Sequence, residues 1–140
     1  MAFEITVAKE KAAQRTREIN ASEGHHRGDE ILSSVGTALN DICREGDTPA
    51  RFGGDEFCII MPHTTAENAQ PLCERIIADF EQTHDGQYHL SIGIAQNGPD
   101  TFLAAEDFVP EADAAMYEPK KNHDSQITIQ PSTDTHLHVV

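Results

Sequence analysis

The sequence predicts a single α/β domain. Segments with the two-residue alternation of β-strands are interspersed with segments of helical spacing, and a glycine-containing hairpin lies near the middle of the chain. The chain has 140 residues, of which 38% are hydrophobic, and this is enough for one modest core. We expect one domain over residues 1–130, followed by a disordered C-terminal tail over residues 131–140.

The first half of the chain predicts a strand, two helices and the hairpin. Residues 3–7 alternate apolar and polar side chains, as a strand with one buried face does. Residues 9–19 combine good helix formers with mixed charges, which predicts a largely solvated helix. Residues 20–30 are polar and contain glycines, so we expect a loop before a second helix over residues 31–42. The hairpin spans residues 51–61.

The second half continues this alternation. A turn with a threonine cap over residues 62–65 precedes an amphipathic helix, whose apolar stripe is Ala69, Leu72, Ile76, Ile77 and Phe80. Residues 88–95 predict a strand. Residues 102–108 form part of a helix before Pro110 opens the helix proper, and residues 127–129 predict a final edge strand.

Charge and cysteine content exclude several classes of protein. Twenty-four acids against ten Lys and Arg give a net charge of −14, which disfavours a nucleic-acid or anionic membrane surface. The three cysteines, Cys43, Cys58 and Cys73, lie in apolar runs and are expected to be reduced core thiols. We find no membrane-spanning stretch and no signal peptide, so we expect a cytoplasmic protein.

The tip of the central hairpin carries the strongest chemical signal. Gly53 and Gly54 leave room for a ligand to approach the main chain, and Asp55 and Glu56 supply carboxylates at a strand end. Carboxylate oxygens are the ligands that Mg²⁺ prefers. The pattern indicates a metal and nucleotide site, and the alternative is an ordinary hairpin with a solvated acidic tip.

The run from Arg51 to Phe57, Arg-Phe-Gly-Gly-Asp-Glu-Phe, closely resembles the signature of the GGDEF-domain diguanylate cyclases. This resemblance implies a nucleotide-cyclase palm, with a mostly antiparallel sheet flanked by helices. It also implies condensation of two GTP molecules into cyclic di-GMP with release of pyrophosphate, dependent on Mg²⁺ or Mn²⁺, across a transient homodimer. Asp55 and Glu56 would be catalytic, Asp55 would bind the metal, and Gly53 and Gly54 would contact the substrate.

The resemblance extends to both sides of the hairpin. Ile19-Asn20, Gly24-His25 and Gly28-Asp29 match the spacing of family positions, which assigns guanine recognition to Asn20 and Asp29 and a weaker substrate contact to His25. Lys120 falls at the position of a triphosphate-binding lysine. The structural alternatives are a turn at Asn20, a helix cap at Asp29 and a helix-dipole contact at Lys120.

Arg44 and Asp47 match the family's Arg-x-x-Asp site, at which cyclic di-GMP inhibits the enzyme. Arginine offers a planar fork to phosphate or to the guanine edge, and Asp47 would accept hydrogen bonds from guanine. The alternative is a polar turn between a helix and a strand.

Three departures from the family pattern limit the inference of catalysis. An ungapped count places Ala12 and Gln14 at the two Asp positions of the metal motif, and Glu10 is the nearest acid. Asp124 stands at the position of a phosphate-binding Arg. The family's usual lead-in does not precede the match, so we expect a fragment or a shortened natural variant. The hypotheses are a diguanylate cyclase, a degenerate GGDEF module that binds GTP or cyclic di-GMP and signals to a partner, and an unrelated hairpin protein.

Overall fold

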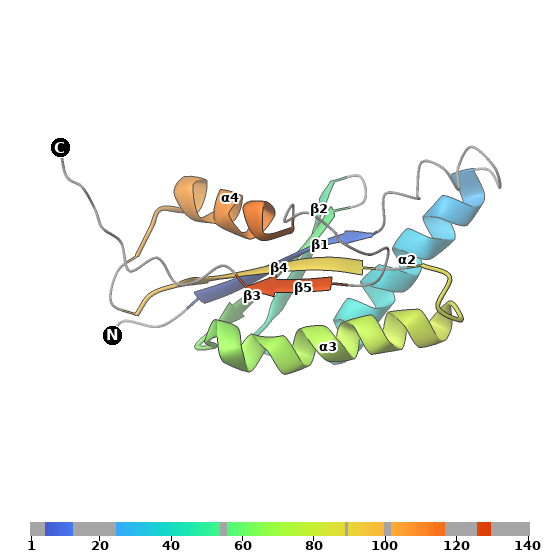
Figure 1. Cartoon of the computed structure of the whole chain (residues 1–140), viewed down its shortest axis with the longest axis horizontal. Helices are drawn as coiled ribbons and strands as arrows, with labels where there is room; N and C mark the ends of the chain where they lie inside the picture. Colours follow the sequence, from blue (N-terminus) through green and yellow to red (C-terminus); the bar gives the residue numbers. More distant parts are fainter. Residues whose placement is uncertain are drawn as a thin grey trace.

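The computed structural model describes residues 5–12, 25–53, 56–88, 90–99, 102–116 and 126–129. The elements follow the predicted alternation of strands and helices (Figure 1), and they are β1 (Ile5–Ala12), α2 (His25–Ile42), β2 (Thr48–Gly53), β3 (Glu56–Pro62), α3 (Ala66–Thr83), β4 (Leu90–Asn97), α4 (Ala105–Met116) and β5 (Gln126–Ile129).

The five strands form one sheet in the order β2-β3-β1-β4-β5. β1 is central and pairs antiparallel with both β3 and β4, and β2 pairs antiparallel with β3. Among the described strands, only β4 and β5 pair in parallel. The prediction of a mostly antiparallel sheet flanked by helices is therefore confirmed, as is the edge strand near the C-terminus.

Helices cover both faces of the sheet (Figure 1). α2 and α3 lie on one face and bury the main core, in which Val35, Ile59 and Ile76 are fully buried. α4 lies on the opposite face, where Phe108 packs with Cys58 and Ala95. Burying each large aliphatic or aromatic side chain contributes about 1.5–3 kcal/mol, so these two contact layers fix the helices on the sheet.

The helix after the hairpin confirms its predicted cap and stripe. The side chain of Thr65 accepts a hydrogen bond from the backbone N–H of Asn68 at 3.1 Å, which caps the first turn of α3. The buried face contains Ala66, Ala69, Leu72, Cys73, Ile76 and Phe80. Cys43, Cys58 and Cys73 are not joined in disulfides; Cys58 and Cys73 are buried, as expected of core thiols, and Cys43 is half-buried.

The prediction of a helix beginning at residue 9 was wrong for residues 9–12. β1 continues to Ala12, and Lys9 is paired with Cys58 of β3 and Gly93 of β4. A central strand hydrogen-bonds on both edges, and this pairing outweighs the weak helix preference of Lys, Glu and Ala. Residues 13–19 lie outside the described part of the chain.

Two helix boundaries also differ from the prediction. We expected a loop through residue 30, but α2 begins at His25. Gly28 is buried, and Arg27 forms an ion pair with Glu30 at 3.0 Å, which is a contact that helical spacing allows. α4 begins at Ala105 and includes Pro110, which we expected to open the helix. The burial of Phe108 fixes the turn before the proline.

Candidate functional site

The β2–β3 hairpin lies where the sequence predicts it. Arg51 pairs with Phe57 and Gly53 pairs with Glu56, with an irregularity in register between Arg51 and Gly53. Glu56 is half-buried and begins β3. Gly54 and Asp55 lie outside the described residues, so the structure fixes the base of the hairpin and not the tip itself.

The end of β1 lies beside this hairpin. Lys11 is paired with Glu56 of β3, and Ala12, the last residue of β1, is paired with Leu90 of β4. The position that the family pattern assigns to a metal-binding Asp is therefore at the strand end next to the acidic hairpin. Ala12 has no oxygen ligand there, and Glu10 is paired with Phe57 further along the strand. Gln14 lies outside the described residues.

α2 carries the one predicted guanine-binding residue that the structure describes in full. Asp29 is exposed in the second turn of α2, so it does not cap the helix. His25 is the first residue of the helix. Asn20, Lys120 and Asp124 lie outside the described residues, and their roles stay predictions.

A groove of about 660 Å³ separates α2 from the hairpin. α2 contributes one face of its side chains at helical spacing, and the two hairpin strands contribute one residue each; the described lining residues are Asp29, Leu32, Ser33, Gly36, Thr37, Asn40, Arg51 and Phe57. The groove has open space beside Gly36, since a Cβ built on this residue meets no atom within 4 Å. Asp29 and Arg51 give the lining one carboxylate and one guanidinium.

This groove was not predicted from the sequence, although the residues on α2 carry a signal for it. Asp29, Leu32, Gly36 and Asn40 recur at intervals of three or four residues, which places them on one face of a helix. That face was hidden because the helix was expected to start after Asp29. A second depression of about 690 Å³ lies on the same helix and is lined by His26, Asp29, Glu30, Ser33, Ser34 and Thr37.

His84, which the sequence predicted only as part of a turn, anchors the helix that carries Asp29. The hydroxyl of Ser34 donates to the carbonyl of Ile31 at 2.7 Å, so Nε2 of His84 donates to the Ser34 oxygen at 2.7 Å. The imidazole also contacts Phe80, with ring centroids 4.6 Å apart, and Tyr88, at 5.3 Å. Together these contacts join the end of α3 to the middle of α2.

The charges around His84 favour its neutral form. Burial is the main cause that lowers the pKa of His84, and the nearby Arg27 guanidinium lowers it further, against a smaller opposing effect of Asp85. Arg27 lies 5.8 Å from the centroid of the Tyr88 ring, and its pKa is raised by hydrogen bonds to Glu30 and Tyr88. The Arg27 guanidinium in the first turn of α2 therefore disfavours protonation of His84.

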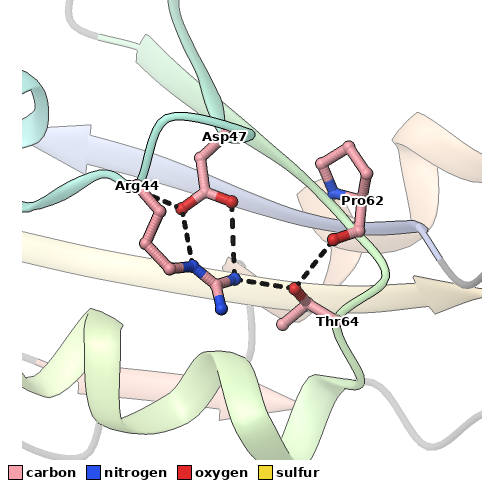
Figure 2. A network of polar contacts seen from close by, with 4 residues as sticks. All are labelled: Arg44, Asp47, Pro62 and Thr64. Carbon is pink, nitrogen blue, oxygen red and sulfur yellow. Dashed lines mark hydrogen bonds and ion pairs between the residues drawn. The ribbon is translucent and has the colours of Figure 1, made fainter.

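Arg44 and Asp47 form a compact polar network at the end of α2 (Figure 2). The Asp47 carboxylate accepts from the backbone N–H of Arg44 at 2.9 Å, from its Nε at 3.3 Å and from its Nη2 at 3.4 Å. The Asp47 side chain is 2% exposed and that of Arg44 is 61% exposed. The structure brings these two predicted residues together, and it adds Thr64, which accepts from Arg44 at 2.8 Å.

The described residues contain neither a candidate membrane span nor a candidate metal cluster. No helix among them is both long and apolar enough to span a membrane. No three His, Cys, Asp or Glu residues of the described ranges gather as metal ligands would.

The fold and the groove indicate the class of protein, which is a palm-like α/β domain with an acidic hairpin beside a groove. Residues 14–126 match the family model described as "Diguanylate cyclase, GGDEF domain". The chain is 34% identical over 119 residues to diguanylate cyclase A of Treponema denticola, an alignment that covers 81% of this chain and 32% of that protein. The chain therefore belongs to the GGDEF-domain diguanylate cyclase family, and it spans about a third of that relative's length.

Solved structures agree on the fold. The GGDEF domain of Pseudomonas aeruginosa TpbB, also called YfiN, is 30% identical, with a TM-score of 0.78 and coverage of 91% of this chain and 77% of that one. The GGDEF domain of DgcB from Caulobacter crescentus, crystallised with cyclic di-GMP, has a TM-score of 0.81 at 22% identity, covering 93% and 80% of the two chains. The hypothesis of an unrelated hairpin protein is therefore wrong.

Proposed function

We propose that this domain binds GTP in the groove between α2 and the hairpin and condenses two GTP molecules into cyclic di-GMP. The observation that carries the proposal is the shared groove, whose walls combine Asp29 of α2 with Arg51 and Phe57 of the hairpin. Its volume of about 660 Å³ is within the usual range for small-molecule sites. Family membership supports the same conclusion.

The groove suits a guanine nucleotide in chemistry as well as size. The exposed carboxylate of Asp29 can accept from the N1–H and N2–H groups of guanine, and Asn20 would add an amide. Leu32 and buried Phe57 provide apolar surface for the base. The guanidinium of Arg51 can neutralise a phosphate, which matters in a chain of net charge −14.

The hairpin acids match Mg²⁺ or Mn²⁺ in chemical type, but the end of β1 lacks the carboxylate that the family pattern has there. Asp55 would be the metal ligand, with Glu56 beside it, whereas Ala12 at the end of β1 supplies no oxygen from its side chain. A bound Mg²⁺ would neutralise phosphate charge and make the 3′-hydroxyl more acidic.

The reaction requires two domains facing one another. Each groove would hold one GTP, and each 3′-oxygen would attack the α-phosphorus of the other GTP, so that a P–O bond forms and pyrophosphate leaves. A carboxylate of the Asp55 and Glu56 pair would accept the hydroxyl proton. A single domain cannot close the ring, so a transient homodimer is part of the proposal.

Ala12 favours a second candidate function, a non-catalytic module that binds GTP or cyclic di-GMP and signals to a partner. The register of β1 places Ala12 beside the hairpin, where the family pattern has a metal carboxylate. Loss of a metal ligand weakens catalysis more than it weakens base recognition, because the base contacts lie on α2. Arg44 and Asp47, which remain in place, would serve ligand sensing in this case.

One experiment separates the two candidates. The purified chain is incubated at high concentration with GTP and MgCl2, and cyclic di-GMP is followed by chromatography, with Asp55→Ala and Glu56→Ala as controls. The cyclase proposal expects product that disappears in both controls. Absence of product, together with cyclic di-GMP binding that is lost in Arg44→Ala, would reject the cyclase and support the sensing module.

A further inference from the structure

Thr64 is buried, and its hydroxyl takes part in hydrogen bonds to Pro62 and Arg44. Its side chain is in the turn between β3 and α3, and the residue is 2% exposed. The hydroxyl donates to the backbone carbonyl of Pro62 at 3.0 Å, and its oxygen accepts from Nη2 of Arg44 at 2.8 Å (Figure 2). Because a hydroxyl has one hydrogen, the bond to Pro62 leaves only lone pairs for Arg44.

This contact determines how the Arg44 guanidinium lies. Nε and Nη2 face the two carboxylate oxygens of Asp47, at 3.3 and 3.4 Å, which are long for charged hydrogen bonds. The bond to Thr64, at 2.8 Å, is the shortest contact of the guanidinium among the described residues. Asp47 holds the guanidinium through two long contacts, and Thr64 adds a shorter third contact on Nη2 that secures the same orientation.

The orientation leaves one edge of the guanidinium for a ligand. Figure 2 shows the third nitrogen, Nη1, pointing away from both Asp47 and Thr64. The Arg44 side chain is 61% exposed, although its acceptors are almost completely buried. A guanidinium held in this way presents a preset donor edge and a flat face, both of which suit the guanine base of a cyclic dinucleotide.

We infer that Thr64 is a positioning residue of the cyclic di-GMP site, acting through Arg44 and not by direct contact with the ligand. The inference rests on the proposed binding of that ligand by exposed Arg44, whose guanidinium is held on one side by buried Asp47. Thr64 lies 20 residues from Arg44 in the chain, so the contact also connects the turn after α2 to the start of α3.

The test compares cyclic di-GMP binding to Thr64→Val, Thr64→Ser and the unmodified chain by calorimetry, with thermal unfolding of each protein. Valine preserves the shape and removes the acceptor, while serine retains the hydroxyl. Thr65→Val is the matched control, because it makes the same chemical change one residue away and removes the α3 cap without touching Arg44. Arg44→Ala verifies that binding occurs at this site.

We expect Thr64→Val to weaken cyclic di-GMP binding about ten-fold, the effect of losing one hydrogen bond to a charged group. Thr64→Ser and Thr65→Val should remain within about two-fold of the unmodified chain. Equal affinity in Thr64→Val would overturn the inference and leave the proposed site intact. So would a loss in Thr65→Val that matches the loss in Thr64→Val, since it would reflect stability alone. No binding to the unmodified chain would reject the site and the inference together.

Discussion

Restoring a carboxylate at the end of β1 tests the central question of metal binding. Lys11 is paired with Glu56, so Ala12 is the next residue along β1, about 3.4 Å further toward the strand end. Ala12→Asp would therefore place an acid beside the hairpin that holds Asp55, the proposed metal ligand. Without a cation the added negative charge should lower stability, by a few tenths of a kcal/mol for neighbouring like charges.

Mg²⁺ should reverse that loss and raise the stability of Ala12→Asp above that of the same variant without the ion. Even a residue that only supports a metal ligand changes metal affinity about ten- to a hundred-fold, so we take ten-fold, or about 1.4 kcal/mol, as the least effect of a direct ligand. For a domain of this size a gain of that magnitude raises the unfolding midpoint by about 4 °C. The same change should lower the Mg²⁺ concentration needed for half-maximal cyclic di-GMP formation.

The assay is thermal unfolding with and without MgCl2, followed by product formation from GTP, and Ala12→Asn is the control that matches size without charge. A response to Mg²⁺ that is the same in the Asp and Asn variants would refute the placement of residue 12 at the metal. Product formation by the unmodified chain that vanishes in Glu10→Gln would instead indicate that Glu10 supplies the ligand.

Three further predictions concern the described site. Gly36→Ala should stabilise α2 by about 0.5–1 kcal/mol and leave nucleotide binding intact. Gly36→Leu should fill the groove and weaken GTP binding at least ten-fold. Equal GTP affinity in the two variants would show that the nucleotide binds elsewhere. Asp47→Ala should cost about 2 kcal/mol in urea unfolding, because it removes the buried acceptor of the Arg44 N–H, and a loss below about 0.5 kcal/mol would contradict the structural role of that network. The folded state lowers the pKa of His84 below the usual 6.5, so folding disfavours protonation of this side chain. The free energy of unfolding should therefore fall as the pH drops below about 6.5, and it should fall less steeply in His84→Gln. Parallel curves of unfolding free energy against pH for the two proteins would show that His84 is not the cause.

The sequence identified the hairpin, the α3 stripe and the family because those signals are local. Gly53 requires little context to mark a turn, Thr65 caps the residue three positions away, and the spacing of Leu72 and Ile76 is set by the helix itself. Residues 51–57 needed no structure to be matched to the family, and the comparison over residues 14–126 agrees.

Tertiary structure decided what lies between distant segments. Lys9 prefers a helix locally but pairs with Cys58 and Gly93, and only those partners extend β1 to Ala12. The groove exists because the hairpin packs opposite α2, and Thr64 meets Arg44 across 20 residues of chain. Such contacts depend on packing between distant segments, which the periodicity of hydrophobic residues along one segment does not reveal. The sequence by itself therefore determined the family and the local elements, whereas the fold determined which residues share a site.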